Sequence, residues 1–233
     1  KNTEEKSLKK QSAGLLFAKV VGFAFAFMIP LLVVRFLNRE QVGVYRQSFQ
    51  VVTNAMSFLS LGVAMSAFSY LSREAEKRAA AVVNILHFHF TTGGLAFFAL
   101  LFFPQILGHL FQSPEMTHLA PLIGVAIWLG MTSVFLETIA VANQETLLST
   151  VFIICAQLSK TVLIIAAVTY FRSVEAIIYA AIVQGAIQTV VLLFYLNSRF
   201  PRFWTTFSFS FLREHLAYAL PFGLAGVLWV MQN

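Results

Sequence analysis

The sequence predicts an all-α, polytopic membrane protein, and three observations support this fold class. Of its 233 residues, 58% are hydrophobic and only 11% are charged, whereas about a quarter of the residues in a soluble domain are charged. The hydrophobic residues form runs of about 20, which is the length of a helix that crosses a bilayer. Most segments between the runs are short and polar. We therefore expect membrane-spanning helices with no soluble domain between them.

The apolar runs predict six complete membrane spans and the start of a seventh. The runs cover residues 12–36, 45–71, 79–103, 119–142, 147–171 and 174–196, and the seventh opens near Leu216. This pattern divides the chain into a six-helix transmembrane lobe (1–198), an aromatic-rich interfacial linker (199–215) and the start of a second lobe (216–233). Because the chain begins with Lys1 and ends inside an apolar run, we expect it to be part of a longer protein.

The distribution of Lys and Arg predicts the orientation of the chain. With a cytoplasmic amino terminus, ten of the 16 basic residues lie in inner segments, four lie in outer segments, and Lys19 and Lys160 lie within spans. The positive-inside rule favours this orientation, with the 199–215 linker also cytoplasmic. We expect a multi-pass protein of the inner (plasma) membrane. The net charge of +6 does not indicate nucleic-acid binding, because the basic residues flank the spans instead of forming a stripe.

The composition disfavours several kinds of chemistry. All ten acidic residues are Glu, so no DxD pair exists for metal-dependent sugar transfer, and the single Cys155 cannot build a disulfide or a thiolate metal site. His87 and His89 are two residues apart and point to different faces of a helix. The sequence has no GxxxxGK[ST] motif, and no Ser or Thr has a local His partner. We expect no catalytic residue, no metal site and no cofactor, and hence a protein that is not an enzyme.

A stripe of polar side chains follows the second predicted span. Its members recur at steps of three and four and therefore share one face of a helix. The stripe consists of Arg46, Gln50, Thr53, Ser57 and Ser60, continued at the same spacing by Ala64, with Asn54 at its edge. Unpaired polar groups cannot face lipid, so the stripe either lines a hydrated internal cavity or bonds to neighbouring helices. Its length favours the cavity.

Lys160 lies roughly 20 Å along the fifth predicted span, near the middle of the membrane. An ionisable residue at this depth is a candidate functional residue, and the alternative is a structural ion pair or a hydrogen bond to backbone carbonyls. Gln157 and Thr161 flank Lys160 on the same helical face and are expected to extend a polar lining.

Lys19 in the first span and Glu137 in the fourth lie at matching depths. This placement is compatible with a mutual salt bridge and equally with a functional role. Gln184 and Gln188 form an i, i+4 pair in the sixth span, which we interpret as hydrogen bonds between helices. Gly22 and Gly185 belong to small-residue stripes that we interpret as packing surfaces.

Two segments of the chain resemble a known family. Residues 35–74 read RFLNREQVGVYRQSFQVVTNAMSFLSLGVAMSAFSYLSRE, and residues 218–223 read YALPFG. They resemble the polysaccharide-transporter family, the Wzx-like oligosaccharide flippases of the multidrug/oligosaccharidyl-lipid/polysaccharide exporter superfamily. The shared features are Arg35-Phe36-Leu37, Glu40-x-x-Gly43-x-Tyr45, Leu61-Gly62 and Tyr70-x-Ser72, followed by the YALPFG opening of the seventh span. One departure is LNRE, where many relatives have a Gly-Pro turn.

The resemblance implies that this chain is the six-helix amino-terminal lobe of an exporter with twelve or fourteen spans. It implies two lobes around a cavity that opens alternately to either face of the membrane. The implied cargo is a polyprenyl-pyrophosphate-linked oligosaccharide, moved from the cytoplasmic to the outer leaflet for O-antigen, capsule or exopolysaccharide biosynthesis. Other implied partners are the lipid bilayer, a coupling proton or sodium ion, and polysaccharide polymerase machinery.

A pyrophosphate in a membrane needs cationic partners, and sugars need hydroxyls and amides. The candidate substrate-binding residues are therefore those expected to line the cavity, namely Lys19, Arg46, Gln50, Asn54, Ser57, Glu137, Gln157 and Lys160.

Several alternatives remain open at this stage. One is a lipid II exporter or a multidrug exporter of the same superfamily, although an exporter of organic cations should carry more acidic residues in this lobe. Another is a membrane-embedded glycan-processing enzyme, which would need a larger outer loop or a catalytic set of His and acidic residues. A scaffold that only recruits partners would leave the polar stripe of the second span unexplained.

Overall fold

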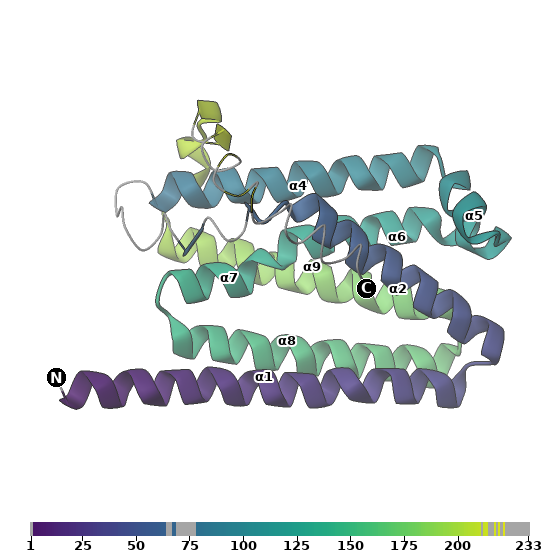
Figure 1. Ribbon diagram of the computed structural model, residues 1–233, viewed down its shortest axis with the longest axis horizontal. Helices are drawn as coiled ribbons and strands as arrows, with labels where there is room; N and C mark the ends of the chain where they lie inside the picture. The colour runs from purple at the N-terminus through teal and green to yellow at the C-terminus, as the bar shows by residue number, and fades with distance from the viewer. Residues whose placement is uncertain are drawn as a thin grey trace.

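Long helices that lie side by side form the body of the molecule, as the computed structural model in Figure 1 shows. The structure describes residues 2–63, 67–68 and 78–210, together with 212, 213, 217, 219 and 221. Within these residues the chain forms helices and connecting turns, and no strand occurs. The all-α fold class predicted from the sequence is confirmed.

The long helices alternate in direction along the bundle (Figure 1). We call the end where the first helix begins the proximal end and the end where it finishes the distal end. The elements are α1 (Asn2–Phe36), α2 (Arg39–Ser60), α4 (Arg78–Phe102), α5 (Gln105–Phe111), α6 (Pro114–Ser133), α7 (Phe135–Ala142), α8 (Thr146–Ala166), the π-helical η2 (Ala167–Phe171), α9 (Val174–Arg199) and the 3-10 helix η3 (Phe203–Thr206).

Three helices that start at the distal end begin with a side-chain cap. Asn38 accepts a hydrogen bond from the backbone N–H of Gln41 at 2.8 Å, and the Gln41 side chain accepts one from the Asn38 N–H at 3.1 Å. This reciprocal pair is a capping box, and it fixes the start of α2. Ser113 caps α6, with Pro114 in the first turn where its missing N–H costs nothing, and Ser173 caps α9.

Five segments of the described chain are long and apolar enough to cross a membrane, and they agree with five of the predicted spans. They are Lys19–Phe36, Arg78–Phe102, Pro114–Ala142, Thr146–Phe171 and Val174–Arg199. The sixth long helix, α2, has 22 residues, or roughly 33 Å at 1.5 Å per residue, but its polar stripe lowers its hydropathy. The polytopic membrane architecture follows from these helices together.

The second predicted span, residues 45–71, is not one continuous helix, and this part of the prediction is wrong. α2 ends at Ser60, and the next two residues are left-handed, with φ of 43° at Leu61 and 69° at Gly62. Glycine adopts this conformation without steric cost, so Gly62 permits the helix to end here. The apolar pattern continues through the break, which is why periodicity did not reveal it. Residues 64–66 and 69–71 of this span lie outside the described residues.

The distal connection between α4 and α6 also differs from the prediction. The sequence indicated a loop, but residues of this connection form α5 and the first turn of α6. The predicted fourth span, residues 119–142, therefore begins earlier, at Pro114. It is also interrupted at Val134, where α6 gives way to α7.

The buried apolar side chains form two separate clusters, one at each end of the bundle. The distal cluster joins the distal halves of α1, α4, α8 and α9 to α6, whereas the proximal cluster joins α7 to the proximal ends of α4 and α9. Representative members are Val33, Ile123, Ile164 and Ile177 in the distal cluster, and Ile85, Phe135, Ile139 and Leu192 in the proximal cluster. The middle of the bundle is therefore free to hold polar side chains.

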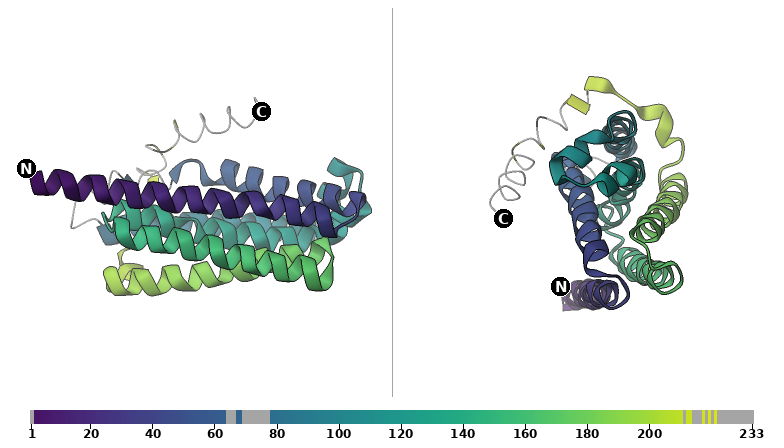
Figure 2. Two further views of the ribbon diagram at one scale, coloured as in Figure 1. Left: turned by 90° about the horizontal axis from the view of Figure 1, so that it is seen from below. Right: turned by 90° about the vertical axis from the view of Figure 1, so that its right-hand side faces the viewer.

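Large apolar side chains also cover the outside of the bundle. On α1, Leu16, Phe17, Phe23 and Phe27 are all exposed. Viewed end-on in Figure 2, α1 and α8 lie on one side of the bundle and α4 and α6 on the opposite side. An exposed apolar surface of this kind is typical of contact with lipid or with another apolar protein surface.

The predicted interfacial linker packs against the proximal end of α4. Phe203 of η3 is buried, the backbone N–H of Ser208 donates to the Asn84 side chain at 3.4 Å, and the rings of His87 and Phe207 lie 4.8 Å apart. Trp204 remains exposed. Of the predicted start of the second lobe, residues 216–233, only 217, 219 and 221 are among the described residues.

Candidate functional site

A partly open cavity lined by both apolar and polar side chains lies between the two apolar clusters of the bundle. Its volume is about 580 Å³, and α2, α4, α6, α7, α8 and α9 all contribute to its wall. Its polar lining residues are Thr53, Ser57, Ser60, His89, Ser133, Glu137, Thr138, Gln157, Lys160, Gln184 and Gln188. Four of the eight residues that the sequence suggested, Ser57, Glu137, Gln157 and Lys160, are therefore brought together at one cavity.

Lys160 contributes an ammonium group to this cavity from α8. Within the described residues it forms no salt bridge and no hydrogen bond, so the structural ion pair considered from the sequence is not formed there. Gln157, one turn earlier on α8, lines the same cavity, as expected. The expectation for Thr161 is wrong, because Thr161 is buried in the packing of the bundle and does not line the cavity.

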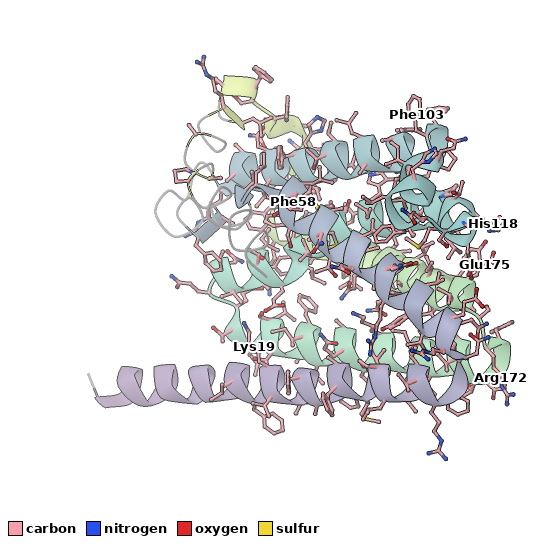
Figure 3. All side chains as sticks on the ribbon, turned by 45° about the vertical axis from the view of Figure 1, so that its right-hand side comes forward. Lys19, Phe58, Phe103, His118, Arg172 and Glu175 are labelled. Atoms are coloured by element: carbon pink, nitrogen blue, oxygen red, sulfur yellow. The ribbon has the colours of Figure 1, made fainter. Side chains whose placement is uncertain are left out.

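Lys19 and Glu137 form the salt bridge that their matching depths allowed. The Lys19 Nζ and Glu137 Oε1 atoms are 3.7 Å apart, and the two side chains are 60% and 50% exposed. Glu137 borders the cavity, whereas Lys19 approaches it only through this carboxylate. Figure 3 shows Lys19 on α1 toward the proximal end, far from Arg172 and Glu175 at the distal end. The pair therefore contributes little net charge to the cavity.

The stripe on α2 divides into two parts. Thr53, Ser57 and Ser60 line the cavity, and the Ser57 and Ser60 hydroxyls donate to the carbonyls of Thr53 and Ser57. Arg46, Gln50 and Asn54 do not border this cavity. Arg46 and Gln50 are exposed. Their role in substrate binding stays a prediction.

Seven of the eleven polar cavity residues were absent from the set of candidates based on the sequence, and His89, Gln184 and Gln188 are three of them. His89 on α4 is completely buried, and neither ring nitrogen has a hydrogen-bond partner within the described residues. Gln184 donates from Nε2 to the Ala156 carbonyl at 3.1 Å, which confirms its expected bond to a neighbouring helix, but its Oε1 has no partner there. Gln188 also lines the cavity. The signal that could have identified His89 is an ionisable residue within an apolar span.

Glycines permit the close helix packing that surrounds the cavity. A Cβ on Gly185 would lie 2.9 Å from the Leu129 Cβ, so this glycine lets α9 approach α6. A Cβ on Gly22 would lie 3.1 Å from the Gln157 Cγ, so α1 packs directly on the stem of that side chain. Both contacts agree with the interpretation of the two small-residue stripes as packing surfaces.

The cavity can bind a ligand through one uncompensated cation, several amides and several hydroxyls. The described residues contain no group of three or more His, Cys, Asp or Glu side chains that could hold a metal ion. These features define a multi-pass membrane protein with a partly open cavity whose polar groups are suited to ligand binding.

Comparison with known families identifies the group to which the chain belongs. The sequence profile of the family described as "Polysaccharide biosynthesis protein" matches residues 8–233, which is nearly the whole chain. The chain belongs to this family. A comparison with curated protein sequences gives no significant match.

Two solved transporter structures share the fold. One is an outward-facing multidrug resistance MATE family transporter of the MOP superfamily, with a TM-score of 0.72, 14% identity and 96% of this chain covered. The other is a MOP superfamily transporter from Pyrococcus furiosus, with a TM-score of 0.66, 17% identity and 94% of this chain covered; its description reports a binding pocket of reversed polarity. This chain spans 52% of the length of each of these transporters.

Proposed function

We propose that this chain is half of a flippase that moves a polyprenyl-pyrophosphate-linked oligosaccharide from the cytoplasmic to the outer leaflet. Lys160, whose ammonium has no carboxylate partner among the described residues and borders a cavity of about 580 Å³, is the observation that carries the proposal. Phosphate oxygens are strong acceptors for an ammonium, and their attraction increases in a site of low dielectric. Membership of the polysaccharide biosynthesis family supports a glycan-linked cargo.

The charge balance of the cavity distinguishes this cargo from an organic cation. Glu137 is the only carboxylate among the described cavity residues, and Lys19 already pairs with it. An exporter of organic cations would need an uncompensated carboxylate, whereas this cavity offers an uncompensated ammonium. Lipid II also carries a polyprenyl pyrophosphate, so a lipid II exporter remains the alternative with the same chemistry.

The proposal includes alternating access, in which the cavity opens to each face of the membrane in turn. A proton or sodium ion is the proposed coupling partner, and polysaccharide polymerase machinery is the proposed recipient of the cargo. The positive-inside pattern supports an inner-membrane protein with a cytoplasmic amino terminus. Cysteine labelling should then find residues 143–146 and the 199–213 linker cytoplasmic, and residues 111–118 outside. Labelling of both sets from one side of the membrane would contradict this topology.

The test is translocation by the full-length protein in proteoliposomes. The substrates are a fluorescent polyprenyl diphosphate that carries one sugar and, as a comparison, a fluorescent organic cation. We expect the lipid to become protected from a membrane-impermeant quencher at a rate that depends on Lys160, with no transport of the cation. The lipid should be chemically unchanged afterwards, because a flippase makes and breaks no covalent bond. Transport of the cation alone would support a multidrug exporter, and a changed lipid mass would support a glycan-processing enzyme.

A further inference from the structure

Three polar side chains from three different helices border the cavity and carry buried hydrogen-bonding atoms that are unsatisfied within the described residues. They are His89 of α4, Gln157 of α8 and Gln184 of α9. Figure 1 shows where these three helices lie in the bundle. Both ring nitrogens of His89 and the Oε1 atoms of the two glutamines lack partners within the described residues. A buried polar atom without a partner costs about 1–3 kcal/mol, so three such groups around one cavity call for an explanation.

A hydrogen bond holds the Gln184 amide, packing holds the stem of Gln157, and both amide oxygens are left free. Gln184 uses Nε2 to donate to the Ala156 carbonyl, which directs its Oε1 elsewhere. The stem of Gln157 packs on Gly22 of α1. His89 is held edge-on against the ring of Phe135, with ring centroids 6.2 Å apart. The three side chains are therefore positioned by packing, while their acceptor or donor atoms remain unused.

The chemistry of these atoms excludes most ligands. Amide oxygens repel an anion, so they are unsuited to the phosphate. A cation is disfavoured because the Lys160 ammonium lies one turn from Gln157 on the same helix. Zinc takes thiolate, imidazole or carboxylate ligands, and no group of three such side chains occurs in the described part of the chain. Hydroxyl groups fit, since each can donate to an amide oxygen or to a neutral imidazole nitrogen and can accept from the imidazole N–H.

We propose that His89, Gln157 and Gln184 form a hydroxyl-binding subsite for the sugar that is attached to the diphosphate, beside Lys160. This inference rests on the proposed function and names the part of the cargo that enters this lobe. The cavity of about 580 Å³ falls within the usual range for small-molecule sites, about 300–1,000 Å³, and so fits a sugar unit better than a whole oligosaccharide. Phe49 and Phe152 line the same cavity and offer apolar surface to the C–H face of a sugar ring.

The subsite is closed in the conformation described here. The free atoms of all three side chains are covered, so a sugar reaches them only when the cavity widens or these side chains rotate. Binding of the sugar would then satisfy the unpaired atoms and stabilise the wider conformation, because a ligand favours the state that it binds better.

The experiment measures the affinity of the full-length protein, in lipid nanodiscs, for three lipids. The lipids are a polyprenyl diphosphate without sugar, the same lipid with one hexose, and the same lipid with one N-acetylhexosamine. We expect the wild-type protein to bind at least one glycosylated lipid about 10-fold more tightly than the bare lipid. Gln157→Leu and Gln184→Leu should each lower this preference about 3-fold without changing the affinity for the bare lipid.

Two further variants make the test specific. Gln105→Leu, in the exposed α5, is the matched control and should leave all three affinities unchanged. Lys160→Ala should lower the affinity for all three lipids by the same factor. Because Gln157→Leu removes no hydrogen bond within the described residues, it tests the subsite even if Gln184→Leu impairs folding.

The possible failures are distinguishable. Binding of the bare lipid without any preference for a sugar, or an undiminished preference in both Leu variants, would overturn the subsite but leave the flippase proposal standing. Failure of the wild-type protein to bind any of the three lipids would overturn both proposals.

Discussion

Lys19 and Lys160 both lie within membrane-spanning helices, but their environments differ. Lys19 on α1 pairs with Glu137 across 3.7 Å and is 60% exposed. Lys160 on α8 borders the cavity and has no carboxylate partner among the described residues. An unpaired charge in a membrane protein is costly and is commonly retained for function, whereas a pair neutralises itself. Depth in the membrane alone therefore does not identify a functional lysine, and the nearest partner of each lysine must also be known.

The largest expected effect comes from reversing the charge at the unpaired lysine. Lys160→Glu should abolish glycan export, because a carboxylate in the cavity repels the pyrophosphate. Lys160→Arg should keep partial function, since the charge persists although a guanidinium differs in shape from an ammonium. The measurement is export in cells whose native copy is deleted. Full export by the Lys160→Glu variant would show that Lys160 is not part of the binding site.

A second prediction concerns which face of α2 is hydrated. Ser57 borders the cavity and Gln50 is exposed, so cysteines at both positions should react with small water-soluble thiol reagents. Phe58 and Phe68 are apolar side chains, and cysteines there should stay protected because they face lipid or protein. Reaction rates in intact membranes provide the readout. Equal protection at all four positions would mean that the stripe on α2 only packs against other helices.

How much of this architecture could be predicted depended on the kind of signal. Hydropathy located five spans, and the Asn38, Ser113 and Ser173 caps explain where α2, α6 and α9 begin. The break after Ser60 was missed, since an uninterrupted apolar pattern does not reveal a left-handed turn at Leu61 and Gly62. The salt bridge between Lys19 and Glu137 agrees with the matching depths of the two residues in their predicted spans, because both helices cross the same membrane.

The cavity itself was only partly predictable. The polar residues at helical spacing on α2 and α8 indicated a polar lining, and Ser57, Gln157 and Lys160 are found there. His89 was missed because the polar residues of α4 are not gathered on one face of the helix, so periodicity gave no sign of which face meets the cavity. The separation of the core into two clusters depends on contacts between distant helices, which no local pattern encodes.

The smallest expected effect comes from the paired lysine. Lys19→Gln and Glu137→Gln each leave the other charged side chain without its partner but exposed. The interaction energy between two half-exposed charges is usually below about 1 kcal/mol. A double-mutant cycle on the thermal stability of the detergent-solubilised protein measures this coupling. Export should change by less than about 5-fold in either single variant. A loss as large as that of the Lys160 variants would show that the pair acts in transport and not only in mutual neutralisation.

The most direct test of the central claim is export per membrane-inserted molecule for Lys160→Ala and Lys19→Ala, measured side by side. If the Lys160 ammonium binds the pyrophosphate, its removal should lower export roughly 10- to 100-fold, the value of one charge-assisted hydrogen bond. The amount of inserted protein should stay near that of the wild type, because no buried partner within the described residues is left unpaired. Lys19→Ala should retain most of its export. Normal export per molecule in Lys160→Ala, or a loss explained entirely by a lower protein level, would contradict the account.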